Sequence, residues 1–317
     1  MELLIDADGV TKRFGKVQAL AGLTLSLPAG RPVAILGPNG AGKTTFIRML
    51  ATLIQPDGGT LRVAGHDVVQ SPMAVRRLIG LAGQSAAVEE SMTGRENLVM
   101  VARLYGQSRT DAKRNSARIL EQMHLVDAAD RLVRTYSGGM RRRLDLGASL
   151  VGAPRLLLLD EPTAGLDPGS RNELWDAIAA MSRTGTDILL TTQYLDEADH
   201  LAAYIVIIDG GKVIAEGAPS ELKSRVGADM VELHTTDVAT LERAAAVLRT
   251  LGLGEPAIDP AARRCSLAAP VGVKLLPAVV RALDEAAVNV EDIALRRPTL
   301  DEVFLALTGQ GTKEAAA

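Results

Sequence analysis

The segment Gly37–Thr44 combines glycines, a lysine and a hydroxyl in an order suited to binding phosphate groups. It reads GPNGAGKT and matches the pattern G-x-x-x-x-G-K-[ST], between an apolar run and a helical segment. Glycines let backbone N–H groups turn toward an anion that side chains would otherwise keep away. Lys43 can add a positive charge beside the β and γ phosphates, and the Thr44 hydroxyl can ligate Mg²⁺. The expected phosphate-binding residues are Gly37, Pro38, Asn39, Gly40, Ala41, Gly42, Lys43, Thr44 and Thr45.

Two neighbouring acids, Asp160 and Glu161, follow the apolar run Leu156–Leu159. A fully apolar run with a polar end is typical of a central parallel strand that is buried on both faces. An aspartate at the carboxyl end of such a strand, beside a phosphate loop, can hold Mg²⁺, and the next carboxylate can polarise the attacking water. A pair of solvated acids is the alternative, and the phosphate loop argues against it. We therefore predict Asp160 as a metal ligand, together with Thr44, and Glu161 as the catalytic base.

The hexapeptide YSGGMR at Tyr136–Arg141 connects this chemistry to a family. It resembles the L-S-G-G-Q signature of ATP-binding-cassette (ABC) ATPases, which phosphate-loop kinases and GTPases lack. A serine and glycine N–H groups at the start of a helix provide a second seat for an anion. The resemblance extends in register over about residues 3–225, and it implies that Ser137, Gly138 and Gly139 contact nucleotide.

Four further residues take roles from this resemblance. Phe14 matches the aromatic residue that stacks on adenine, and Gln84 matches the glutamine that touches Mg²⁺ and senses the membrane partner. Asp167 matches the D-loop aspartate, also at the nucleotide. Gln193 stands where most relatives have histidine, and its amide can donate to the γ-phosphate but cannot become charged near neutral pH. Gln193 and Glu161 are the implied catalytic residues, with Glu161 as the base.

Departures from the general pattern narrow the family. Met140 in place of glutamine, Gln193 in place of histidine and the segment Thr299–Gly309 together resemble the daunorubicin-resistance group of exporter ATPases. The resemblance implies ATP and Mg²⁺ as cofactors, a head-to-tail homodimer with two ATP molecules, and a separate permease that contacts the segment from Gln84 to about Tyr105. It further implies a peripheral protein at the cytoplasmic face of the membrane. Hydrophobic drugs or polyketide-like natural products are the implied cargo, with lipids or glycolipids as a rival.

The elements that must position these residues alternate along the chain. Short apolar runs separated by helical segments indicate a mixed, mostly parallel α/β sheet. The runs are Val33–Leu36, Arg155–Asp160, Ile188–Thr192 and Tyr204–Asp209. With the resemblance, this predicts an ABC cassette over residues 1–225, including a helical subdomain at about 85–150. Later residues follow a β-α-β-β-α-β order whose last strand is expected at Val288–Leu295. This order resembles a small ferredoxin-like unit, so we expect an α+β accessory domain at 226–309 and a tail at 310–317.

The composition excludes several classes of protein. The 317 residues carry a net charge of −3, which gives no global attraction to nucleic acid, so none is expected as a partner. Apolar runs such as Leu156–Leu159 are far shorter than the about 20 residues that a membrane-spanning helix needs. The single cysteine, Cys265, fits a reducing compartment, and the scattered histidines form no cluster with zinc-like spacing.

Two other functions stay open at this point. A soluble ABC ATPase acting on ribosomes or DNA usually carries two cassettes or a long coiled coil, and neither is visible. A regulatory ATP-binding module without turnover is disfavoured by Glu161 but left open by Gln193. The run Arg141–Arg143 spreads around its helix, which favours a solvated face over a nucleic-acid patch. Trp175 is expected to pack within an amphipathic helix.

Overall fold

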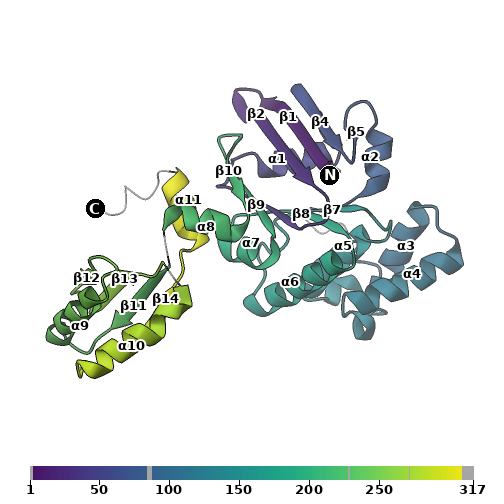
Figure 1. Cartoon of the computed structure of the whole chain (residues 1–317). Helices are drawn as coiled ribbons and strands as arrows, with labels where there is room; N and C mark the ends of the chain where they lie inside the picture. Colours follow the sequence, from purple (N-terminus) through teal and green to yellow (C-terminus); the bar gives the residue numbers. More distant parts are fainter. Residues whose placement is uncertain (1–2, 84–87, 228, 271, 309–317) are drawn as a thin grey trace. The chain divides into compact units, whose positions relative to one another are not determined.

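The computed structural model describes residues 3–83, 88–227, 229–270 and 272–308 (Figure 1). The chain divides into two compact units, Met1–Pro219 and Ser220–Ala317, and each has its own hydrophobic core. Helix α8 (Pro219–Val226) lies at the division. Within the described ranges, no helix is both long and apolar enough to cross a membrane.

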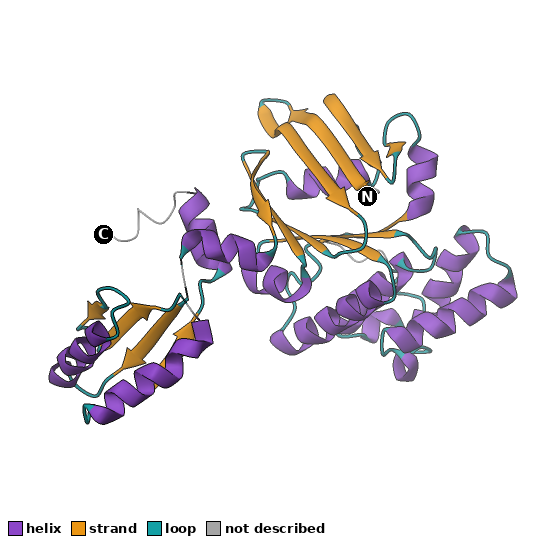
Figure 2. Cartoon of the chain, in the orientation of Figure 1, coloured by secondary structure: helices purple, strands orange, loops and turns teal. Residues whose placement is uncertain are grey.

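Two sheets form the framework of the first unit (Figure 2). One is antiparallel, in the order β2-β1-β4-β5, and the other has the order β10-β9-β3-β8-β7-β6. In the second sheet β9, β3, β8, β7 and β6 run parallel, and β10 pairs antiparallel with β9. This is the mixed, mostly parallel arrangement that the sequence predicted. The strands are β1 (Leu3–Phe14), β2 (Val17–Pro28), β3 (Val33–Leu36), β4 (Gly58–Val63), β5 (His66–Asp67), β6 (Ile79–Ala82), β7 (Leu156–Asp160), β8 (Asp187–Thr192), β9 (Tyr204–Asp209) and β10 (Lys212–Gly217).

Several helices of this unit begin at residues suited to capping. Thr93 and Glu96 form a capping box at α3, and Ser108, Ser137 and Asp167 cap α4, α5 and α6. Side-chain oxygens at these positions accept from amides that lack a partner within the helix, so the local sequence fixes where each helix starts. The helices are α1 (Lys43–Leu50), α2 (Pro72–Leu78), α3 (Gly94–Leu104), α4 (Arg109–Gln122), α5 (Gly138–Ser149), α6 (Pro168–Arg183) and α7 (Leu195–Leu201), with short 3-10 turns at Val126–Ala128 and Val133–Thr135.

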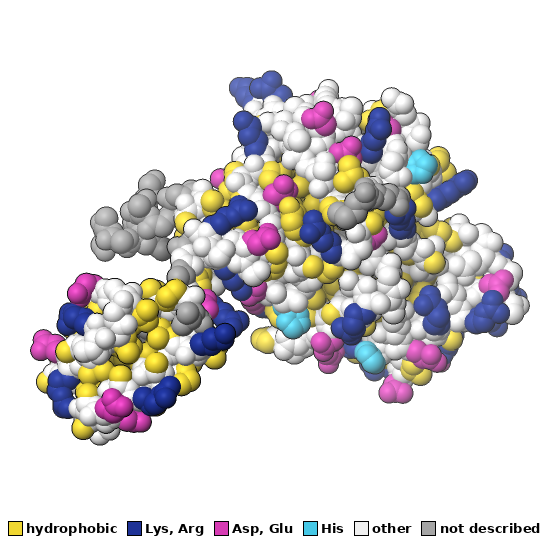
Figure 3. Space-filling view, in the orientation of Figure 1, with side chains coloured by type: hydrophobic (Ala, Val, Ile, Leu, Met, Phe, Trp, Pro, Cys, Tyr) yellow, Lys and Arg dark blue, Asp and Glu magenta, His cyan; other side chains and the backbone are white. Residues whose placement is uncertain are grey.

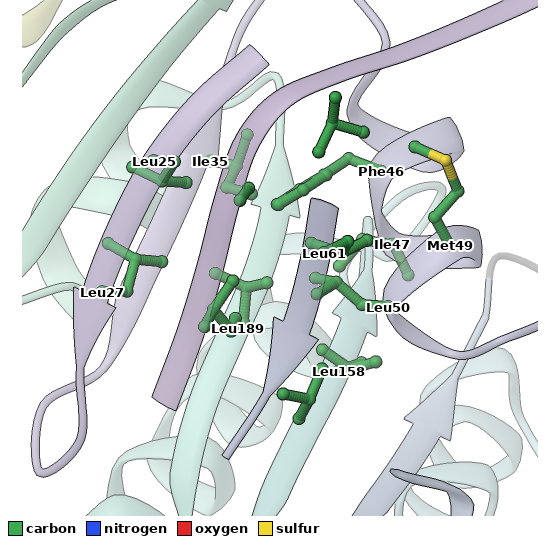
Figure 4. Close-up of a cluster of buried hydrophobic side chains, with 14 of the residues drawn as sticks. Leu25, Leu27, Ile35, Phe46, Ile47, Met49, Leu50, Leu61, Leu158 and Leu189 are labelled. Carbon is green, nitrogen blue, oxygen red and sulfur yellow. The ribbon is translucent and has the colours of Figure 1, made fainter. Parts of the chain in front are cut away.

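The main core lies between the two sheets, where α1 is packed (Figure 4). Phe46, Ile47 and Leu50 from one face of α1 belong to the same buried cluster as Leu61 of β4 and Leu158 of β7. Burial of side chains of this size contributes roughly 1.5–3 kcal/mol each before entropy costs. Figure 1 shows α5 and α6 on the other face of the parallel sheet. This packing fixes α1, and therefore the loop that precedes it, against the sheet.

The second unit is an antiparallel sheet of order β12-β13-β11-β14, in the predicted β-α-β-β-α-β sequence order. Along β11, Val231 and Leu233 are buried while Glu232 between them is partly exposed, which is the alternation of a half-buried strand. Cys265 of β13 is buried in the same core, which α9 and α10 complete. The elements are β11 (Met230–His234), α9 (Val238–Thr250), β12 (Ala257–Asp259), β13 (Arg264–Ala268), a 3-10 turn at Gly272–Leu275, α10 (Leu276–Glu285), β14 (Asp292–Arg296) and α11 (Leu300–Thr308).

Surface charges are interspersed on the face seen in Figure 3, where Lys and Arg lie among Asp and Glu. Some oppositely charged side chains are in direct contact, as in the pair of Lys12 with Asp57 at 2.7 Å and the pair of Arg95 with Asp130 at 2.8 Å. Exposed pairs of this kind contribute little to stability, but they cancel charge locally. This face therefore presents no continuous basic surface.

Candidate functional site

The predicted chemical residues follow neighbouring parallel strands. The loop Gly37–Gly42 follows β3, Gln193 follows β8, and Asp160 and Glu161 lie at the end of β7. Because β3, β8 and β7 are adjacent and parallel, their carboxyl ends meet at one edge of the sheet. Gln84 comes after β6, the next strand in the sheet, and lies outside the described residues.

Glycines are required in the loop for steric reasons. Gly42 has a φ of 105°, and a Cβ there would lie 2.4 Å from the Ala19 carbonyl oxygen. A Cβ at Gly37 would lie 2.2 Å from the Ile208 carbonyl oxygen. Helix α1 begins directly after Gly42, and no side chain caps its first turn. The free amides and the positive end of the helix dipole are therefore directed into the loop.

A pocket of about 340 Å³ opens at this loop. Its lining brings together two groups of predicted residues, since the loop contributes Asn39–Thr45 and β7 leads to Glu161. The sequence reasoning missed two contributors, Val17 and Ala19, which come from β2. Val17 pairs with Phe14 across the β1–β2 hairpin, and half-exposed Phe14 therefore lies next to a pocket-lining residue.

Lys43 is buried at the floor of the loop. Its Nζ donates hydrogen bonds to the carbonyl oxygens of Gly37 at 2.7 Å and Pro38 at 3.1 Å, and it lies 4.0 Å from Glu161 Oε1. Burial lowers the pKa of the Lys43 ammonium, although the charges of Glu161 and Asp160 act in the opposite direction. The loop therefore holds a cation close to a carboxylate, and a phosphate oxygen can compete with that carboxylate for the ammonium of Lys43.

Two hydroxyls converge on the buried carboxylate of Asp160. Thr44 Oγ1 donates to Asp160 Oδ1 at 3.1 Å, and Thr191 Oγ1 donates to the same oxygen at 2.6 Å. Hydroxyl and carboxylate oxygens are the donors that Mg²⁺ prefers. The predicted metal ligands Thr44 and Asp160 are thus in direct contact, and their chemistry fits this ion.

Glu161 has an unusual backbone conformation. Its φ is 48°, in the left-handed region that non-glycine residues rarely adopt. Its N–H donates to the Thr191 carbonyl oxygen at 3.1 Å and to Thr191 Oγ1 at 3.2 Å. The side chain lies at the pocket and is 15% exposed. A carboxylate held at this position can accept a proton from a water molecule in the pocket.

The signature and the D-loop lie together, apart from the pocket lining. Ser137 Oγ accepts from the Met140 amide at 3.2 Å, and Asp167 accepts from the amide and hydroxyl of Ser170 at 2.9 and 2.7 Å. The Ser170 hydroxyl and amide hold the pKa of the Asp167 carboxyl below its usual range. A Cβ at Gly139 would lie 2.4 Å from Ser170 Oγ, so α5 and α6 approach closely here. Predicted residues that do not line the pocket, among those described, are Phe14, Gly37, Pro38, Ser137, Gly138, Gly139, Asp160, Asp167 and Gln193.

The expectation of a solvated face was wrong for Arg142. It is only 9% exposed and donates to the backbone carbonyl oxygens of Asp160 and Glu161. Arg141 and Arg143 instead form ion pairs with Glu90 and Glu173. The sequence carries no direct signal for such contacts, because every peptide group offers a carbonyl.

Trp175 of α6 makes a polar contact in addition to its packing. Its Nε1 donates to Glu197 Oε1 of α7 at 3.0 Å. Its ring also stacks on His200, with the ring centroids 4.9 Å apart. These contacts join α6 to α7, the helix that follows Gln193.

Comparisons with known proteins agree with this geometry. Residues 20–164 match the family described as ABC transporter. The chain is 48% identical over 314 residues to daunorubicin resistance ATP-binding protein DrrA3 of Streptomyces coeruleorubidus, with 98% of each protein covered. It is 49% identical over 320 residues to daunorubicin/doxorubicin resistance ATP-binding protein DrrA of Streptomyces peucetius, which covers 98% of this chain and 96% of that protein.

Solved structures of ABC transporter subunits have a similar fold. A solved ATP-binding subunit of an ABC transporter superposes with a TM-score of 0.62 at 26% identity, covering 70% of this chain and 92% of that one. The same family is therefore indicated by the phosphate loop, the paired acids, the signature and the similarity over nearly the whole chain. The chain belongs to the family of daunorubicin-resistance ATP-binding proteins, which are the ATPases of ABC exporters.

Proposed function

We propose that this ABC ATPase powers the export of hydrophobic drugs or polyketide-like natural products through a separate permease. The observation that carries the cargo class is the similarity to daunorubicin resistance proteins over nearly the whole chain. The ATPase works at the cytoplasmic face of the membrane as a peripheral subunit. Its cassette comprises residues 1–225, an accessory domain comprises 226–309, and a tail comprises 310–317.

In this proposal the phosphates of ATP bind to the loop Gly37–Thr45, and Lys43 neutralises the β and γ phosphates. The pocket of about 340 Å³ and the uncapped start of α1 support this assignment. Phe14 stacks on the adenine ring at the end of the β1–β2 hairpin, where its pairing with Val17 brings it beside the pocket.

The proposed metal ligands are Thr44, Asp160 and Gln84. Bound Mg²⁺ would offset the charge that the phosphates develop during hydrolysis. Glu161 orients the attacking water and takes up its proton, and the Gln193 amide donates to the γ-phosphate. The contact of Thr44 with Asp160 at 3.1 Å supports a shared ligand set.

The signature acts on the ATP of a second copy of the chain. The signature residues Ser137, Gly138 and Gly139 are not among the described residues that line the pocket. This supports a head-to-tail homodimer in which each signature closes the partner's site. Asp167 lies beside the signature through Ser170, so it joins the same interface.

The permease binds at an apolar surface of the first unit. A groove of about 400 Å³ is lined by Leu53, Val101 and Tyr105, among others. Leu104 next to it is 80% exposed, and such exposed apolar residues are typical of docking surfaces. Nucleotide-driven closure of the dimer would reach the permease through this surface.

The test uses the whole chain co-expressed with a candidate six-helix permease from the same genome. Inverted vesicles should accumulate an anthracycline only with ATP and Mg²⁺. Leu104→Glu should lower recovery of the permease in a pull-down without changing ATP binding, because it places a charge in an apolar contact. Val126→Glu, at a residue 53% exposed, is the matched control and should leave recovery unchanged. ATP hydrolysis with permease bound but no drug accumulated would reject the cargo class alone.

A further inference from the structure

One guanidinium joins three separate segments next to the proposed base. Arg142 lies in the second turn of α5, the helix that begins at the signature. Its side chain is 10% exposed and its Nη1 lies 3.6 Å from Asp145 Oδ2 of the same helix. Its donors reach the carbonyl oxygens of Pro162 from Nε at 2.6 Å, of Glu161 and Asp160 from Nη2 at 3.1 and 3.4 Å, and of Gly83 from Nη1.

These acceptors belong to two functional segments. Asp160, Glu161 and Pro162 are consecutive residues at the end of β7. Gly83 follows β6 and directly precedes Gln84 in the sequence. Hydrogen bonds from a charged donor are about twice as strong as neutral ones, and the planar fork of arginine fixes their directions. Arg142 therefore ties the β7 end and the segment leading to Gln84 to the signature helix.

The contact with Glu161 acts on a strained residue. A left-handed backbone at a non-glycine position is strained and persists only where its surroundings determine it. The N–H of Glu161 is held by Thr191, and its carbonyl oxygen is held by Arg142. Both peptide groups that flank the Glu161 Cα are thus restrained from outside.

We propose that Arg142 is a positioning residue that holds the Glu161 backbone so that its carboxylate stays at the pocket, and that links this position to α5 and to Gly83. The inference rests on the proposed role of Glu161 as base. A buried arginine that merely stabilises α5 is the competing explanation, and the neighbouring Arg143 provides the comparison. The Arg143 side chain is 12% exposed, donates to the Met123 carbonyl oxygen at 3.2 Å and pairs with Glu173 at 3.1 Å, and neither partner belongs to β7.

The experiment compares Arg142→Gln, Arg142→Lys and Arg143→Gln in the full chain. Melting temperature, ATP affinity, kcat and KM are measured for each. Arg142→Gln should lower kcat about 10- to 100-fold with ATP affinity and KM nearly unchanged, because small misplacements of a reacting group can cost that much. Arg142→Lys should recover part of kcat, since an ammonium can reach some of the carbonyls. Arg143→Gln should keep kcat even if it melts lower.

A double variant distinguishes failure of the positioning role of Arg142 from failure of the proposed role of Glu161 as base. If Arg142 acts through Glu161, Arg142→Gln should add no further loss of single-turnover rate in a Glu161→Gln background. Fully additive losses, or a parental kcat for Arg142→Gln beside an inactive Glu161→Gln, would overturn the positioning role alone. An active Glu161→Gln would instead remove the proposed base. If Arg142→Gln melts below the assay temperature, Arg142→Lys carries the same test.

Discussion

Lys43 and Glu161 place opposite charges 4.0 Å apart at the pocket proposed to bind nucleotide. An incoming triphosphate is attracted by the ammonium and repelled by the carboxylate, so the two side chains have opposed effects on affinity. In the proposed mechanism the carboxylate of Glu161 nevertheless accepts the proton of the attacking water. A substitution of Glu161 can therefore change ATP turnover without a loss of ATP affinity.

Glu161→Gln should abolish turnover while ATP still binds. Loss of a general base typically lowers the rate about 10²–10⁴-fold, and the neutral amide no longer repels phosphate. ATP that cannot be hydrolysed should then hold a dimer together, which size-exclusion chromatography with ATP and Mg²⁺ can detect. Hydrolysis at the parental rate would remove Glu161 from the mechanism.

At the residue scale, the sequence predicted those pocket residues whose positions depend on their neighbours in the chain. The loop Asn39–Thr45 was predicted because glycine conformation and helix start are encoded within the segment itself. Val17 and Ala19 come from a distant strand whose approach depends on the packing of the two sheets. Arg142 was misjudged because its partners are backbone carbonyls, which leave no trace in residue types.

Between elements, α6 and α7 are joined through a fully buried acid. Glu197 of α7 accepts from Trp175 Nε1 at 3.0 Å. Burial raises the pKa of Glu197, although the neighbouring polar groups of Thr192, Thr163 and Trp175 act against this. A carboxyl whose pKa is raised in the folded state stabilises the fold below its unfolded pKa, and this contribution is lost as the pH rises through the folded pKa.

Glu197→Gln should therefore melt at a higher temperature than the parent at about pH 8, with the difference shrinking toward about pH 5. The amide keeps an oxygen for Trp175 but never ionises. Thermal unfolding followed across this range tests the sign. Asp176→Asn, which removes a carboxylate from an exposed position of α6, is the control. A difference that does not grow with pH would contradict buried ionisation.

Element boundaries were predicted least well where short strands meet turns. The expected strand at Val288–Leu295 is shorter and later, as β14. Val288 N–H bonds to the Leu283 carbonyl at 2.9 Å, and its side chain is buried, so this residue ends the α10 turn instead. Strand β12 has three residues. The β-α-β-β-α-β order required a strand before β13, but no residues were assigned to it, because a segment so short has no periodicity.

For the whole molecule, mixing two inactive variants tests the proposed dimer. Ser137→Arg should bind ATP but not hydrolyse it, because the signature would serve the partner's site. Lys43→Ala should lose nucleotide affinity and activity. In a mixed head-to-tail dimer both changes fall on one site and leave the other intact, so ATPase assays of the mixture should recover part of the activity. A fully active Ser137→Arg, or a mixture as inactive as its components, would argue against a shared site.

The parallel pairing in the main sheet of the first unit was within reach of the sequence, because strands that alternate with helices favour a parallel sheet. The antiparallel layer over α1 was not, since its register depends on long-range pairing between β1 and β4. The family resemblance supplied that layer indirectly, as part of a cassette.

The burial of Cys265 has a practical consequence for measuring how nucleotide enters the pocket. It is the chain's single cysteine, and its position in the core of the second unit raises the pKa of its thiol. Maleimide reagents, which need an accessible thiolate, will react with it poorly. A cysteine introduced at Val17, on the rim of the pocket, would thus carry a fluorophore at one defined place in an otherwise native sequence. Nucleotide entry could then be followed optically in real time, without first removing any natural thiol.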